Sequence, residues 1–73
     1  MRYFKQTFGN MENIYAVVYG AHKNGNLKAV IISDIRRKAI KTSIRNQDVW
    51  TSINIENVPV NLLDRAFSAI NQV

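Results

Sequence analysis

Hydrophobic positions in the first half of the chain follow the pattern of a β-hairpin. Residues 13–22 and 27–33 are both rich in β-branched and aromatic residues, the residue types that favour strands. Between them lies the dipeptide Asn24-Gly25, which tolerates the positive φ angles of a two-residue type I′ turn. The pattern therefore predicts an antiparallel hairpin about a turn at 24-25.

Both faces of this predicted hairpin are apolar. Folding the chain about the turn places Tyr19 opposite Val30. One face then carries Tyr15, Val17, Tyr19, Val30 and Ile32. The other face carries Ile14, Ala16, Val18, Leu27, Ala29 and Ile31. A hairpin with one face in water would alternate with polar residues, so we expect this one to be central and covered on both sides by helices or by another subunit.

A third strand is predicted before the hairpin. Residues 2–8 are compatible with a strand, and Gly9-Asn10 can turn them back onto the hairpin to give a meander. With this turn, Phe4 lies beside Tyr15. We expect an aromatic face made of Phe4, Phe8, Tyr15 and Tyr19.

The C-terminal segment has helical periodicity. Pro59 suits the first turn of a helix, and the following positions place their apolar residues on one arc. These residues are Leu62, Leu63, Ala66, Phe67, Ala69, Ile70 and Val73. We predict an amphipathic helix that lies on a sheet. Before it, apolar and polar residues alternate strictly, which predicts a half-buried strand near 49–56.

Residues 35–45 fit two different elements. As a helix capped by Ser33 or Asp34, the segment gathers its cations Arg37, Lys38, Lys41 and Arg45 on one face. As a strand, it alternates Ile40, Thr42 and Ile44 with Lys41, Ser43 and Arg45. We favour a basic helix at 34–45, because it keeps these cations out of the core together despite repulsion at i, i+4 spacing.

Together these elements predict one α+β domain spanning residues 1–73. It contains a small antiparallel sheet, a meander around the 24-25 turn, with the C-terminal amphipathic helix and the basic helix at 34–45. A chain of 73 residues with 47 % apolar residues has no room for a second core. The longest apolar run, 15–21, is far shorter than the ~20 residues of a membrane-spanning helix. No secretory signal is visible, so we expect a cytoplasmic protein.

The residue types available for chemistry are few. The chain has no cysteine, and His22 is its one histidine, so we predict no metal site and no cofactor. The five acidic residues are dispersed along the chain, whereas acid–base catalysis needs titrating groups that converge in a pocket. We therefore expect no enzymatic activity.

Positive charge is concentrated in the middle of the chain. The net charge is +5, and residues 34–48 hold five cations against two acids. Cations on one helical face suit the phosphates of nucleic acids, because binding releases counterions. The first hypothesis is therefore a small nucleic-acid-binding accessory or regulatory module. Its phosphate contacts would be Arg36, Arg37, Lys38, Lys41 and Arg45.

The second hypothesis is a protein-interaction module, a compact inhibitor or adaptor of the phage or mobile-element type. It would cover an acidic or apolar surface of a partner protein with Trp50, Tyr15 and Tyr19. Exposed, the same aromatic residues would instead stack on bases. Because so small a core gives limited stability, we also expect a homodimer formed through the sheet. High salt should weaken nucleic-acid binding steeply, whereas Trp50→Ala should weaken a protein complex most.

Overall fold

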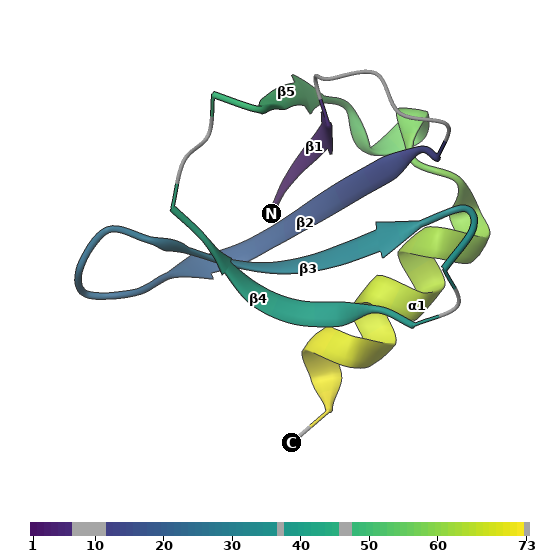
Figure 1. The fold of residues 1–73 in the computed structure, drawn as a ribbon. Helices are drawn as coiled ribbons and strands as arrows, with labels where there is room; N and C mark the ends of the chain where they lie inside the picture. The colour runs from purple at the N-terminus through teal and green to yellow at the C-terminus, as the bar shows by residue number, and fades with distance from the viewer. Residues whose placement is uncertain (7–11, 37, 46–47, 73) are drawn as a thin grey trace.

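The structure of the protein is a computed structural model that describes residues 1–6, 12–36, 38–45 and 48–72. It confirms the α+β class: a five-stranded antiparallel sheet is followed by one C-terminal helix that packs on it (Figure 1). The strands are β1 (Arg2–Gln6), β2 (Ile14–Ala21), β3 (Leu27–Ser33), β4 (Ile40–Ile44) and β5 (Trp50–Ile53). A 3₁₀ turn, η1 (Ile55–Asn57), leads into the helix α1 (Val60–Asn71).

The strand order in the sheet is β4-β3-β2-β1-β5. The first four strands form a meander in which each pairs with the next, and β5 returns to pair with β1 on its other side. The hairpin of β2 and β3 therefore lies near the centre, as its two apolar faces predict. The edges of the sheet are β4 and β5.

The turn of the central hairpin lies at the predicted position but has a different geometry. Gly25 has a φ of 90°, whereas Asn24 has a negative φ. The His22 N–H donates to the Asn26 carbonyl at 2.7 Å, and the Gly25 N–H donates to the His22 carbonyl at 3.0 Å. These bonds close a three-residue loop that ends on a left-handed glycine. The prediction of a two-residue type I′ turn is wrong.

The pairing register of the hairpin also differs from the prediction. Val30 lies opposite Val17 and not opposite Tyr19. The longer loop shifts the pairing by one residue, and an irregularity between Val18 and Gly20 shifts it by one more. Beyond the irregularity the shift totals two residues, which keeps these side chains on their original faces because side chains alternate with a period of two. The two core clusters separate the same two sets of residues. The predicted division of the hairpin into two faces is therefore confirmed.

Helix α1 covers one face of the sheet and builds the first core. Pro59 is its N-cap residue, so the helix begins one residue after the proline that was predicted to lie in its first turn. The buried helix residues Leu62, Leu63 and Ala66 pack with four hairpin residues. These are Tyr15, Val17, Val30 and Ile32. The predicted apolar arc of the helix is confirmed except at Val73, which lies outside the described residues.

The opposite face of the hairpin is covered by curvature of the sheet itself. A second core joins Phe4, Ala16, Val18, Leu27, Ala29 and Ile44. Ile44 and Trp50 belong to β4 and β5, the two opposite edges of the sheet, and both pack with this cluster, so the sheet must curl to bring its edges together (Figure 1). Phe4, Leu27, Ile44 and Trp50 meet without leaving space for a water molecule. Neither of the predicted covers, a helix on each side or another subunit, is needed to bury this core.

Strand β1 pairs one residue away from the predicted register. Phe4 lies opposite Ala16, and Lys5 takes the place opposite Tyr15. A shift of one residue moves a side chain to the other face, so Phe4 belongs to the second core and not to the predicted aromatic face. Lys5 Nζ lies over the Tyr15 ring, 5.9 Å from its centroid. Phe8 and the predicted Gly9-Asn10 turn lie outside the described residues.

The helix predicted at 34–45 is wrong, and the alternative strand is confirmed for Ile40–Ile44. Ser33 Oγ accepts the Arg36 N–H at 2.9 Å, the contact that a helix cap makes. The chain nevertheless continues into β4, which pairs with β3 and places Ile44 opposite Leu27. Pairing satisfies one side of the β4 backbone and buries Ile44 to 7 % exposure, a gain that an isolated surface helix lacks.

The last predicted strand is shorter than expected. It spans Trp50–Ile53 rather than 49–56, because η1 begins at Ile55.

Within the described ranges, no helix has the length and apolar character needed to cross a membrane.

Candidate interaction surface

The basic segment singled out in the sequence follows the β4 edge of the sheet. Arg36 and Lys38 precede β4, Lys41 lies within it, and Arg45 comes directly after it. Arg37 lies outside the described residues. Because the segment is extended, these cations do not share the helical face on which the phosphate-binding hypothesis depended.

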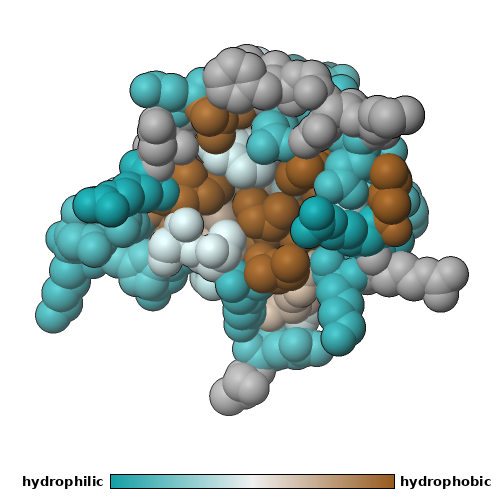
Figure 2. Space-filling view, in the orientation of Figure 1, coloured by the Kyte–Doolittle hydropathy of each residue, from teal (hydrophilic) through white to brown (hydrophobic). Residues whose placement is uncertain are grey.

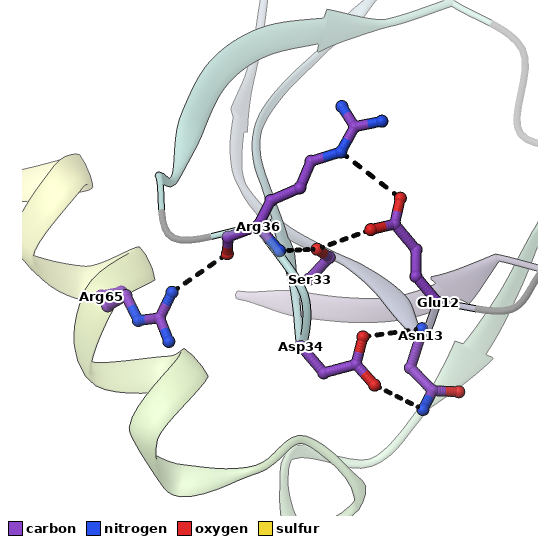
Figure 3. A network of polar contacts seen from close by, with 6 residues as sticks. All are labelled: Glu12, Asn13, Ser33, Asp34, Arg36 and Arg65. Atoms are coloured by element: carbon purple, nitrogen blue, oxygen red, sulfur yellow. Dashed lines mark hydrogen bonds and ion pairs between the residues drawn. The ribbon is translucent and has the colours of Figure 1, made fainter.

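Arg36 belongs to a polar network where the chain leaves β3 (Figure 3). Its Nε lies 3.4 Å from Glu12 Oε1, so a carboxylate balances its charge. Glu12 Oε2 also accepts the Ser33 hydroxyl at 3.2 Å. The Arg36 carbonyl accepts a hydrogen bond of 3.1 Å from Arg65 on α1. Arg36 therefore has a structural role that ties the end of β3 to the helix.

A second part of the network closes the same end of the β2–β3 hairpin. Asp34 Oδ1 accepts the Asn13 backbone N–H at 3.0 Å, and Asp34 Oδ2 accepts the Asn13 side-chain amide at 2.9 Å. The Asp34 N–H in turn donates to the Asn13 carbonyl at 3.2 Å. Two of the five acidic residues, Glu12 and Asp34, thus act as structural acceptors at the end of the hairpin opposite its turn.

The remaining described cations of the segment are exposed. Lys41 Nζ donates to the Gln72 carbonyl at 3.0 Å, where a cation interacts favourably with the C-terminal end of a helix dipole. Lys38 borders an open cleft of about 350 Å³ against the α1 residues Asp64 and Ser68. Arg45 stands exposed at the other end of β4. Positive charge therefore flanks the edge strand at both of its ends.

A small apolar notch lies beside the start of β4. Its volume is about 70 Å³, and its lining combines four isoleucines with a polar border: Ile14, Ile31, Ile32 and Ile40, with Glu12, Ser33, Arg36 and Lys38. Ile40 is 48 % exposed, so the notch opens to the surface. In Figure 2, hydrophobic residues gather near the centre of the face turned to the viewer. Sequence reasoning missed the notch because only the β3–β4 pairing brings Ile40 beside Ile31.

The outer side of β4 is one of the two edges of the sheet. Four of its five residues are exposed, and an edge strand presents backbone N–H and C=O groups that no neighbouring strand pairs. Ile40, Thr42 and Ile44 point to the curled face, and Lys41 and Ser43 point to the helix face. The edge therefore has one apolar side and one basic side.

The three aromatic residues proposed as a contact surface lie on different faces. Trp50 is partly buried and packs with the second core. Tyr15 is only 6 % exposed within the first core, and Tyr19 packs against that same core. These side chains therefore do not form one continuous platform.

Comparison with protein-family models, with curated proteins and with solved structures finds no match to this chain.

Proposed function

We propose that the protein is a non-enzymatic protein-interaction module that accepts an extended segment of a partner protein as an additional strand along β4. The observation that carries this proposal is the exposed edge of β4, with cations at both ends and an apolar notch beside its start. Strand addition of this kind gains affinity from main-chain hydrogen bonds and specificity from alternating side chains.

The two sides of β4 define the chemistry of the expected partner. Successive residues of an added strand point to opposite faces. Residues on the side of Ile40 and Ile44 would then be apolar, and residues on the side of Lys41 and Arg45 would be acidic. The matching segment therefore alternates apolar and acidic residues.

Charge argues against a second copy of the chain as the added strand. Antiparallel pairing of two β4 strands about Thr42 would place each Lys41 opposite Ser43 of the other copy. The two Lys41 side chains would then be diagonal neighbours on one face, about 7–8 Å apart, with Arg45 of each copy on the same face. Repulsion between like charges weakens such a pair, and a lysine in the middle of an edge strand is a common protection against self-pairing. An acidic partner turns the same residues into favourable contacts.

A designed peptide tests the proposal directly. We expect a fluorescein-labelled eight-residue peptide of alternating Val and Glu to bind in a fluorescence-polarisation titration. A peptide of the same composition with four Glu followed by four Val should bind at least about tenfold more weakly, a loss of ~1.4 kcal/mol, because it cannot place all its acids on one side. Equal affinities for the two peptides would contradict strand addition.

Variants of the protein locate the binding surface. The double change Lys41→Glu and Arg45→Glu should lower the affinity for the alternating peptide by at least about tenfold. The matched control Arg2→Glu and Lys5→Glu makes the same change in net charge on β1 and should leave affinity within about twofold. Two further peptides carry methyl groups on every second backbone nitrogen, one on the odd and one on the even positions. One of the two should lose binding and the other should keep it, because only alternate N–H groups of an added strand face β4.

A further inference from the structure

A second polar cleft lies between the turn of the central hairpin and the C-terminal half of β4. It is lined by His22, Lys23, Asn24, Asn26 and Ser43 and has a volume of about 530 Å³. His22 Nε2 and Ser43 Oγ share a hydrogen bond of 2.9 Å. This bond joins the hairpin turn to the edge strand across 21 positions of sequence, so the cleft exists only in the folded chain.

The cleft is rich in hydrogen-bond donors. Asn24 Oδ1 already accepts the Asn26 N–H at 3.1 Å, which leaves the Asn24 amide NH₂ as its available group. Lys23 adds an ammonium, and Ser43 adds a hydroxyl. None of the five lining residues carries a carboxylate. The lining therefore suits an anion with several acceptor oxygens.

Further cations surround Ser43 on the helix face of the sheet. Lys28 lies directly opposite Ser43 in the β3–β4 ladder. Arg45 follows Ser43 by two positions, a Cα spacing of about 7 Å in an extended chain. Lys41 precedes Ser43 by the same spacing, with its ammonium on the Gln72 carbonyl. The carboxylates of Glu12 and Asp34 lie at the opposite end of the β2–β3 hairpin. Within the β2–β3 hairpin, the acidic residues therefore lie at the open end, and the cations Lys23 and Lys28 lie toward the turn and the cleft.

We propose that this cleft binds a phosphate group, with the backbone of a nucleic acid as its principal source. A phosphate offers the acceptor oxygens and the negative charge that the lining and its cations match. The hairpin turn projects from the rest of the molecule at the left of Figure 1, so a long strand can pass across the open cleft. The proposed site replaces the helical face at 34–45 as the place where a nucleic acid would be contacted.

Polarisation titrations with a fluorescein-labelled 20-nucleotide single strand at 50 and 200 mM salt test this proposal. We expect salt-sensitive binding, and the double variant Lys23→Ala and Lys28→Ala should weaken it by at least about tenfold. Loss of two phosphate contacts should also reduce the slope of log affinity against log salt by about 1.4. The control Arg2→Ala and Lys5→Ala removes the same charge from β1 and should retain affinity within about twofold.

A second arm distinguishes the two sources of the phosphate group. Inorganic phosphate is titrated into the wild-type protein and both variants, and the His22 ring signals are followed by NMR. Tighter binding of the oligonucleotide than of inorganic phosphate assigns a nucleic acid, whereas binding of inorganic phosphate alone at the same residues assigns a small phosphate ligand. No binding of either, or equal losses in the two variants, would overturn the proposal. The Val/Glu peptide should bind the Lys23/Lys28 variant normally, so failure here is distinct from failure of strand addition.

Discussion

At the residue scale, the glycines of β2 and its turn have different requirements. Gly25 has a φ of 90° but space around its missing side chain, since an added Cβ would meet no heavy atom within 4 Å. Its requirement is therefore conformational. Gly20 has no such φ, and a Cβ there would contact Lys28 Cδ at an ordinary 3.5 Å.

This difference predicts unequal effects of alanine. Gly25→Ala should lower the free energy of unfolding by about 1–3 kcal/mol, because an L-residue is strained at this φ. Gly20→Ala should change it by less than about 1 kcal/mol, since it meets no steric or backbone conflict and loses chain entropy in the unfolded state. Urea denaturation followed by circular dichroism measures both values. Equal losses in the two variants would contradict a conformational role for Gly25.

At the scale of elements, the clasp between Asn13 and Asp34 holds the open end of the central hairpin. The carboxylate of Asp34 accepts two hydrogen bonds from Asn13. Asp34 directly follows Ser33, the last residue of β3. Loss of these bonds should open the β2–β3 ladder first at this end, because the hydrogen bonds at the turn end do not involve Asn13 or Asp34.

We therefore expect Asp34→Ala to cost about 1 kcal/mol in the free energy of unfolding, the usual value of an exposed hydrogen-bonded contact. Amide exchange should accelerate at the start of β2 and the end of β3 more than near the turn. The control Asp64→Ala removes the same charge from an exposed position on α1 and should change stability by less than about 0.5 kcal/mol. Uniform acceleration along both strands would argue against a local clasp.

The elements also show which parts of the fold a sequence determines locally. The helix and the faces of the hairpin were predictable because each depends on a repeating pattern within one segment. The register was not, since it depends on the three-residue loop and on the irregularity between Val18 and Gly20. The segment 34–45 satisfied both helical and strand patterns, and its pairing with β3 decided between them.

The candidate surfaces were predictable only in part, for the same reason. The basic composition of the middle segment is visible in the sequence, and four of its five cations border β4 as described above. The notch beside Ile40 and the cleft between His22 and Ser43 join residues that are distant along the chain. No local pattern marks such pairs, so neither surface could be inferred before the strand order was known.

At the scale of the whole molecule, curvature lets a sheet of five short strands enclose apolar residues on both sides with a single helix. The homodimer inferred from the sequence stays a prediction, but the apolar face that motivated it is largely buried within one chain: Ala16 and Ala29 are fully buried, and Val18 is 4 % exposed. A dimer would therefore need a different surface from the centre of the hairpin.

The central hairpin lies between the two cores, so adjacent residues of one strand pack into different cores and should contribute to stability independently. Val17 belongs to the core under α1, whereas Val18 belongs to the core inside the curl. In double-mutant cycles, the stability losses of Val17→Ala and Val18→Ala should add within about 0.5 kcal/mol although the residues are covalent neighbours. Val17→Ala and Leu62→Ala should deviate from additivity by more than this, since both change the packing of one core.

Each cycle compares the wild type, the two single variants and the double variant by chemical denaturation. Sodium sulfate is added because it favours the folded state and so keeps the double variant folded enough to be measured. Strong coupling between Val17 and Val18 would show that the sheet transmits packing changes from one side to the other. Additivity would mean that the two sides can evolve separately: the chain can remodel the interior of its curl without disturbing the packing of its helix, despite having only 73 residues.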